Sequence, residues 1–329
     1  MGRKRKAKFQ KLPKYVYNNN GSVVYRPWVE GALQKPVRLG NSTTPLSEIW
    51  ANYEALTGES RDTLQFIVNQ YFEGDDFKNL KSGKEVRRAL GVLLNQPIGG
   101  QVFGRILIKD ITPGVIRKYL DYRNNVAGNR EISYLSKAWS WCYERDIVTI
   151  PNPCKGVRRK TESPRTRYVT DKEYKLVYDL APEYMQTAME LAYLCRMRLS
   201  ETLDTRVRDI QDKGLHTRRL KGSNDAITLW SERLHNVVNN GLRGQLRVPD
   251  MPVVNDGKGS PIKASRFHTA WQRLMKKDEL RGIERFTFQD LKAKGVSDFD
   301  GDKKKASGHK SESMVAVYDR KITEIESTS

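Results

Sequence analysis

The pattern of apolar and polar positions divides the chain into a short β-rich segment and two longer, mainly helical segments. Near the N-terminus, residues 15–17 and 23–25 are rich in Tyr and Val, and the Asn-Asn-Asn-Gly sequence at 18–21 predicts a turn between two strands. Thr44 followed by Pro45 predicts a helix start, with Thr44 as the N-cap residue. We therefore expect a small sheet followed by a helix.

From about residue 62 the apolar positions recur at the spacing of amphipathic helices. Thr112-Pro113 is the start signal of the third of these helices, and Asn152-Pro153 ends the pattern. The four apolar stripes are Leu64, Ile67, Val68, Tyr71 and Phe72; Val86, Leu90, Leu93 and Leu94; Ile116, Tyr119 and Leu120; and Ile132, Leu135, Trp139 and Cys142. The pattern predicts an all-α middle domain.

A capping box, Thr-Asp-Lys-Glu at 170–173, predicts the start of a third domain. A helix to about Cys195, a helix from Ser200, a strand-rich stretch over 207–230 and a helix over about 264–277 follow. The expected fold is a small β-sheet with a helix, then an all-α domain, then a mixed α+β domain that is mainly helical. The expected boundaries are 1–60, 61–154, a basic linker over 155–169, and 170–329.

The composition indicates a folded protein with a polyanionic partner. Hydrophobic residues make up 38% of the 329 residues and six are Trp, so the chain can form packed cores. The 59 Lys+Arg against 39 Asp+Glu give a formal charge of +20, which is typical of proteins that bind nucleic acid. The chain has no apolar run of about 18 residues and no signal-peptide pattern, so we expect a cytoplasmic protein.

Two segments concentrate this positive charge. Residues 1–46 hold ten Lys/Arg and one acid, and residues 155–167 hold six and one. A solvated tail or a localisation signal is the simplest interpretation of such a run. The interleaved aromatic residues favour a DNA-binding arm, and the linker's charge favours contact with phosphates. The candidate DNA-binding residues are Arg3, Lys4, Arg5, Lys6, Lys8, Arg158, Arg159 and Lys160.

The candidate catalytic residues lie in the last 140 positions. Arg198 precedes Glu201 by three, Lys221 lies in a Leu-Lys-Gly-Ser turn, and Tyr318 follows the Ser-Gly-His step at 307–309 by nine positions (318 − 309 = 9). A tyrosine is a weak nucleophile because a phenol ionises near pH 10. It becomes effective where cations surround the electrophile, and a phosphodiester suits such a site. Taken alone, Arg198 and Glu201 predict only a salt bridge, and Lys221 only a turn lysine.

In this order the residues resemble the tyrosine recombinases (the phage integrase family). The family's first box has the pattern Gly-x-Arg-x-Ser-Glu-Leu, so that Arg198 takes the arginine position and Glu201 the acidic one, while Arg196 stands where the family usually has glycine. The Ser-Gly-His step resembles the family's Leu-Gly-His, and the family shows the same nine-residue spacing to its tyrosine. The resemblance implies that Tyr318 is a nucleophile.

The N-terminal third extends the resemblance to the whole chain. Gly2-Arg3-Lys4-Arg5, Leu12-Pro13, the Asn-Asn-Gly turn and Leu39-Gly40 resemble the arm-site-binding domain of lambda-type integrases. The resemblance implies arm-binding, core-binding and catalytic domains. It also implies a homotetramer on double-stranded attachment sites in the nucleoid of a bacterial host, with DNA-bending proteins and an excision factor as further partners. Ile322 and Ile325 are expected to pack on a neighbouring subunit.

The resemblance also implies a reaction. In the family, tyrosine attacks a phosphodiester, forms a 3′-phosphotyrosyl link and releases a 5′-hydroxyl group. On this chain Arg198 and Lys292 would hold the non-bridging oxygens, Lys221 would be the general acid, and His309 would hydrogen-bond the phosphate. Because the chain has no phosphate-cradling Gly-rich loop, no acidic cluster suited to Mg²⁺ and no cysteine spacing suited to a metal, we expect neither cofactor nor metal.

The second box departs from the family. The family has His-x-x-Arg, and this chain has Gln289 and Lys292 in those positions. An ammonium group keeps the charge but cannot bind two oxygens at once, a loss of roughly 1–3 kcal/mol. Gln289 can donate a hydrogen bond but cannot transfer a proton. The 17 positions from Lys292 to His309 (309 − 292 = 17) are fewer than the family's, and Arg281 and Arg285 are candidates to replace the missing arginine.

Two hypotheses of different classes follow. One is a recombinase that integrates or excises a prophage or another mobile element. The other is a catalytically weakened or inactive DNA-binding protein on the same fold, for which Gln289 and Lys292 would be signs of decay. A structural nucleoid-type protein explains the three-domain layout poorly.

Overall fold

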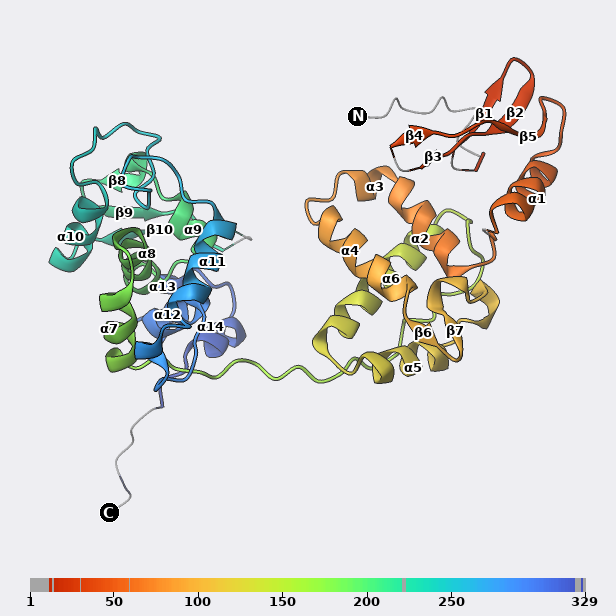
Figure 1. Ribbon diagram of the computed structural model, residues 1–329. Coiled ribbons are helices and arrows are strands. Elements are labelled where there is room, and N and C mark those ends of the chain that lie inside the picture. Colours follow the sequence, from red (N-terminus) through yellow and green to blue (C-terminus); the bar gives the residue numbers. More distant parts are fainter. Residues whose placement is uncertain are drawn as a thin grey trace. The chain divides into compact units, whose positions relative to one another are not determined.

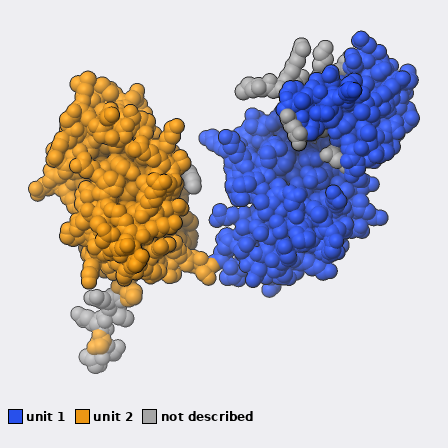
Figure 2. Space-filling view, in the orientation of Figure 1, with its two compact units in different colours: residues 1–162 blue, residues 163–329 orange. Residues whose placement is uncertain are grey.

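The computed structural model of the protein describes residues 12–13, 15–29, 31–58, 60–220, 223–322 and 327. The chain divides into two compact units, 1–162 and 163–329 (Figure 2). Each unit contains its own hydrophobic core. Within the described ranges, no helix combines the length and the apolar character needed to cross a membrane. The finer division of residues 1–162 at position 60 stays a prediction.

The first unit begins with a three-stranded antiparallel sheet and a helix (Figure 1). Asn20 and Gly21 both have positive φ, 48° and 84°, as a tight hairpin turn requires, so the predicted turn is confirmed. The core between the sheet and the helix includes Val23, Leu39 and Tyr53. The elements are β1 (Val16–Asn19), β2 (Ser22–Tyr25), β3 (Trp28–Val29), β4 (Ala32–Leu33), β5 (Val37–Asn41) and α1 (Leu46–Thr57).

Helix α1 begins one residue later than the sequence predicts, and Thr44 does not cap it. The Thr44 hydroxyl group accepts a hydrogen bond from the Asn41 backbone N–H at 2.9 Å and donates one to the Asn41 Oδ1 at 3.1 Å. Pro45 takes the N-cap position, without a side-chain cap. The prediction was wrong because the turn at Asn41 uses the hydroxyl group that would have capped the helix.

The rest of the first unit is helical, as predicted. Thr112 accepts a hydrogen bond from the Val115 N–H at 3.4 Å and Pro113 is the first helical residue, so this start signal is confirmed. The predicted apolar stripes form one core around Trp139 and Tyr119. The elements are α2 (Leu64–Glu73), α3 (Asp75–Lys78), α4 (Gly83–Leu94), β6 (Pro97–Ile98), β7 (Gln101–Val102), η2 (Phe103–Arg105), η3 (Ile108–Asp110), α5 (Pro113–Arg123) and α6 (Val126–Tyr143).

The second unit is mainly helical, with one small antiparallel sheet in the order β10-β9-β8 (Figure 1). The capping box at Thr170 and Glu173 is present. The sequence did not predict α10, which Ser231 caps by accepting a hydrogen bond from the Leu234 N–H at 3.2 Å. The elements are α7 (Asp171–Leu180), α8 (Glu183–Leu194), α9 (Leu199–Asp204), η4 (Val207–Asp209), β8 (Ile210–Gln211), β9 (Gly214–Thr217), β10 (Ala226–Leu229), α10 (Glu232–Gly241), α11 (Ala264–Leu274), η5 (Asp278–Leu280), α12 (Phe288–Ser297), α13 (Lys303–Ser307) and α14 (Glu312–Tyr318).

Helix α12 lies in the centre of the second unit, against α8. A Cβ atom at Gly295 would lie 2.1 Å from the Tyr193 carbonyl oxygen, so only glycine permits this close approach. Every residue of α12 except Gln289 is buried. The buried residues include two lysines, Lys292 and Lys294, whose surroundings differ sharply.

Candidate active site

The turn before α9 positions Arg198. Arg196 adopts a positive φ of 53°, the left-handed region that glycine occupies without strain. This explains why the family usually has glycine here. In this chain the Arg196 side chain is anchored instead: its Nε donates to the Ala306 carbonyl oxygen at 3.2 Å, and its guanidinium group lies 4.6 Å from the Phe299 ring centroid. The turn is thereby attached to the segment that carries His309.

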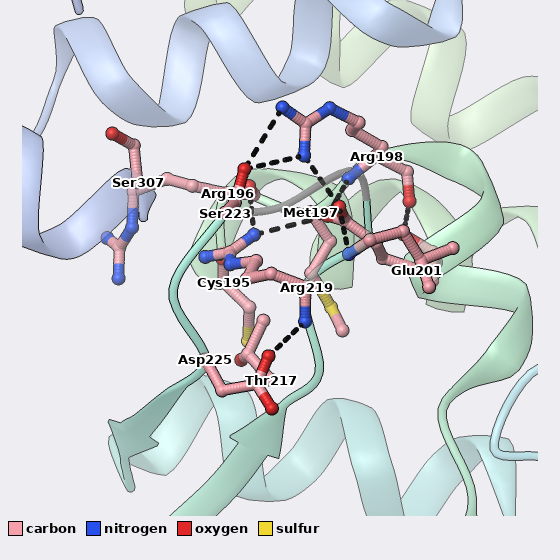
Figure 3. A network of polar contacts seen from close by, with 12 residues as sticks. Cys195, Arg196, Met197, Arg198, Glu201, Thr217, Arg219, Ser223, Asp225 and Ser307 are labelled. Carbon is pink, nitrogen blue, oxygen red and sulfur yellow. Dashed lines mark hydrogen bonds and ion pairs between the residues drawn. The ribbon is translucent and has the colours of Figure 1, made fainter. Parts of the chain in front are cut away.

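Glu201 joins two arginines within the site. Its carboxylate accepts hydrogen bonds from the Arg198 backbone N–H at 2.8 Å and from the Arg198 Nη1 at 2.7 Å (Figure 3). The second partner is the Nη1 of Arg219, at 3.3 Å from the same carboxylate. Burial raises the pKa of Glu201, but these hydrogen bonds and nearby positive charges outweigh it and hold the pKa below its usual value. Glu201 therefore remains ionised and fixes the Arg198 guanidinium group.

Arg219 is a site residue that sequence reasoning missed. Its buried guanidinium group donates from Nη1 to the Arg196 carbonyl oxygen at 2.6 Å, and from Nη2 to the Cys195 and Ala306 carbonyl oxygens at 2.8 and 3.3 Å (Figure 3). The available signal was the alternation along β9: Leu215, Thr217 and Arg219 are buried. An arginine that continues the buried face of a strand needs internal partners.

Gly308 allows the chain to turn into the site. It has a φ of +72°, and a Cβ there would lie 2.7 Å from the Asn224 carbonyl oxygen. The next residue, His309, is buried; its Nδ1 lies 2.9 Å from the Ser307 Oγ. Its ring centroid lies 4.7 Å from that of Tyr318. The structure thus brings His309 and Tyr318 together, as the nine-residue spacing predicts.

Two residues of α12, one helical turn apart, face the same tyrosine. The Gln289 side-chain amide donates to the Tyr318 Oη at 3.1 Å. The Lys292 Nζ lies 5.4 Å from the centroid of the Tyr318 ring. The second box of the sequence therefore does reach the candidate nucleophile, although its residue types differ from the family's.

The cations of this site act on one another. Burial first, and then the charges of Arg219 and Arg198, lower the pKa of Lys292 to about 7, against the opposing effect of Glu201. Burial, and then the charges of Lys292 and Arg198, lower the pKa of His309 to about 4. Among the residues that the structure describes, neither the Lys292 Nζ nor the His309 Nε2 has a hydrogen-bond partner. Such groups favour an anionic ligand.

Further contacts fix the segment that carries Tyr318. The Ser297 Oγ donates to the Tyr318 carbonyl oxygen at 3.1 Å and accepts from the Arg320 N–H at 2.7 Å. The buried carboxylate of Asp290 accepts from the Arg320 Nη1 at 2.6 Å and is paired with the Arg165 Nε at 3.0 Å. These contacts attach the end of α14 to α12, so that Tyr318 is presented next to Gln289.

Other sequence-predicted residues lie elsewhere. Arg281 is 80% exposed and pairs with Asp278 at 2.8 Å, and Arg285 is exposed, so Arg219 is the additional guanidinium group that the structure places in the site. Ile322 is 89% exposed. The predicted residues outside the described ranges are Arg3, Lys4, Arg5, Lys6, Lys8, Lys221 and Ile325. In the described parts of the chain, no cluster of His, Cys, Asp or Glu could hold a metal ion.

Solved structures share the fold of the chain. A lambda integrase dimer bound to a COC′ core site and a lambda integrase tetramer bound to a Holliday junction each match with a TM-score of 0.64 at 20% identity, over 98% of this chain and 99% of the other. The Tn1549 transposon integrase with circular intermediate DNA matches with a TM-score of 0.59 at 14% identity, over 79% and 96%. No curated protein sequence matches the chain.

The chain therefore has an integrase-like fold, with a small antiparallel sheet, a helical middle and a mainly helical C-terminal domain. Residues 167–324 match the phage integrase family. This part of the chain belongs to the phage integrase family, the tyrosine recombinases, and the resemblance seen in the sequence is confirmed.

Proposed function

We propose that the protein is a site-specific DNA recombinase that cleaves and rejoins DNA through a 3′-phosphotyrosyl intermediate. The observation that carries the proposal is that Lys292 and His309 lie against the Tyr318 ring, with the Arg198 charge close enough to act on both. A site of buried cations beside a phenol suits attack on a phosphodiester, whose non-bridging oxygens gain charge in the transition state.

Each residue has a role in the proposed reaction. The Tyr318 Oη forms a bond to phosphorus while the bond from phosphorus to the 5′ oxygen breaks. Arg198, fixed by Glu201, binds a non-bridging oxygen, and the His309 Nε2 donates to the phosphate. Lys221 protonates the leaving 5′ oxygen. The phosphodiester energy is kept in the covalent link, so the reverse steps rejoin the strand.

The first unit would deliver DNA to this site. Arg159 and Lys160 of the basic linker line a hollow of about 550 Å³ with Asn129 and Arg130 of α6. Together with Arg158 and the basic arm, these side chains are suited to phosphate contacts. Because solved relatives are bound to core-site DNA as a dimer and to a Holliday junction as a tetramer, we infer action as a tetramer on duplex attachment sites, with arm-binding, core-binding and catalytic parts.

Trapping on a nicked suicide substrate tests the proposal. The cleaved strand beyond the nick diffuses away, so the native protein should accumulate a covalent complex, and Tyr318→Phe should abolish it while binding the same DNA. A covalent complex with the Phe variant would overturn the assignment of the nucleophile. Salt-dependent binding by the native protein with no covalent product under any condition would instead support the non-catalytic alternative.

A further inference from the structure

The site must remove a proton from Tyr318, and the residue beside its hydroxyl group cannot do so. The Gln289 amide lies 3.1 Å from the Tyr318 Oη. Neither end of an amide takes up a proton at neutral pH. In the family's pattern a histidine stands at this position, so its acid–base capacity is missing here. Another group must accept the phenolic proton.

Two nitrogen atoms near the tyrosine are candidates. The His309 Nε2 and the Lys292 Nζ are both buried, and neither has a partner within the described ranges. His309 has a pKa of about 4, so it is neutral but a very weak base. The pKa of Lys292 is about 7, which makes its amine the stronger base while leaving much of it neutral at pH 7–8.

Lys292 lies next to the Tyr318 ring. It is three residues after Gln289 on the same face of α12, and its Nζ lies 5.4 Å from the Tyr318 ring centroid. Its side chain is fully buried. The charged and titratable groups around it come from several elements. They are Arg196 and Arg198 in the turn before α9, Glu201 in α9, Arg219 after β9, His309 after α13 and Tyr318 in α14. Cations outnumber the single carboxylate.

We propose that Lys292 is the general base for Tyr318, taking the place of the histidine that this chain lacks. The proposal rests on the proposed function. As the Tyr318 Oη bonds to phosphorus, its proton passes to the neutral Lys292 amine. The resulting ammonium group lies in the site where charge develops on the phosphate. In rejoining, the 5′-hydroxyl group attacks, the bond between phosphorus and Tyr318 breaks, and Lys292 returns the proton.

The proposal accounts for the residue types at positions 289 and 292 together. An arginine at position 292 could not accept the proton, because a guanidinium group stays charged in proteins. A histidine at 289 could accept it, so the family's pair divides the two tasks between two residues. In this chain Lys292 has both tasks: it first accepts the proton as a base and then carries the positive charge, while Gln289 has neither.

The decisive experiment is single-turnover cleavage of a suicide substrate by the full chain. Lys292→Arg keeps the positive charge and removes the base, so the rate at pH 7.5 should fall by about 100-fold. The double variant Q289H/K292R supplies a histidine base and should recover most of that loss. Lys175→Arg, at an exposed position of α7, is the matched control for the substitution type. Full activity of K292R alone, or no recovery in the double variant, would overturn the proposal.

A second readout separates the base from the acid. With sulfur as the bridging 5′ atom, the leaving group needs no proton, so loss of the general acid is tolerated and loss of the base is not. This substrate should restore cleavage by Lys221→Ala and leave K292R slow. The cleavage rate of the native protein should rise with pH through about 7, and the rate of K292R should not show this rise. Rescue of K292R by sulfur would make Lys292 an acid, and no native cleavage at all would sink the recombinase function itself.

Discussion

Helix α12 carries two buried lysines, Lys292 and Lys294, whose side chains have opposite surroundings. They are 0% and 2% exposed and two residues apart, so they point to different sides of the helix. The Lys294 Nζ pairs with Asp298 at 2.9 Å and with Asp171 at 2.6 Å, and it lies 3.2 Å from the Tyr168 hydroxyl group. The Lys292 Nζ has none of these partners in the described structure.

The partners decide the direction in which each pKa moves. Burial lowers the pKa of Lys294, but hydrogen bonds to Asp171, Asp298 and Tyr168 outweigh burial and raise it. For Lys292, burial and the neighbouring arginines act in the same direction, and its pKa falls to about 7. Equally buried lysines therefore differ in pKa, because one is paired with carboxylates and the other lies among cations. A buried lysine without a partner, next to a candidate nucleophile, is typical of a catalytic site.

Removing the two ammonium groups separately gives the largest expected effect. Lys294→Met leaves the partly buried Asp298 carboxylate without its ion pair, and it should lower the free energy of unfolding at pH 7 by about 3 kcal/mol. Lys292→Met replaces a desolvated amine by an apolar chain of similar length, and it should not lower that free energy. Calorimetry of the full chain measures both, through the transition of residues 163–329.

The same pair of variants should behave in the reverse way in cleavage. Lys292→Met should lose covalent trapping, while Lys294→Met should retain it below its own melting transition. If Lys292→Met were as destabilised as Lys294→Met, the native site would have to stabilise the Lys292 charge, and the contrast between the two lysines would be lost.

The pH dependence of stability should show the next largest effect. The folded-state pKa of Lys292, about 7, lies below the unfolded value near 10.4, so between these values the unfolded state binds more protons. The free energy of unfolding should therefore rise with pH, by about 1.5 kcal/mol from pH 7 to 8.5. Urea denaturation at several pH values measures this slope.

Lys292→Met is the control for this measurement, because it removes the titrating amine and should remove most of the slope. His309 titrates in a lower window, since its folded pKa of about 4 lies below the unfolded value near 6.5, and it adds stability with rising pH only there. A slope that survives in Lys292→Met would assign the proton uptake to another group.

Much of the fold follows from local signals in the sequence. The capping box at Thr170, the Thr112-Pro113 helix start and the hairpin at Asn20-Gly21 are determined by residues within a few positions of one another. The Thr44 cap was wrong because Asn41 engages the same hydroxyl group, through its backbone N–H and through its side-chain oxygen. Local chemistry predicts an element well unless a second local partner is available.

In the candidate site, too, contacts between residues close in sequence were predictable, and contacts between distant residues were not. The nine positions from His309 to Tyr318 span one turn and one short helix, and the two rings lie close together in the structure. The contacts of Arg219 reach back 23 residues to Arg196 and forward 87 to Ala306, and no local pattern encodes them. The contrast between the two lysines is equally non-local, since Lys294 meets Tyr168 from 126 residues away.

Giving Lys292 a carboxylate partner should produce the smallest effect and make the sharpest test of the comparison. Gln289→Glu places an acid three residues before Lys292 on the same helix face, much as Asp298 lies four residues after Lys294. The pKa of Lys292 should rise, and the slope of stability between pH 7 and 8.5 should shrink by about 1 kcal/mol over that range. Cleavage should fall because Lys292 is then already protonated. Gln289→Met, which adds no charge, should keep the slope. An unchanged slope in Gln289→Glu would mean that the charge at residue 289 does not affect the pKa of Lys292. The two residues would then not act together in the way that the proposed base requires.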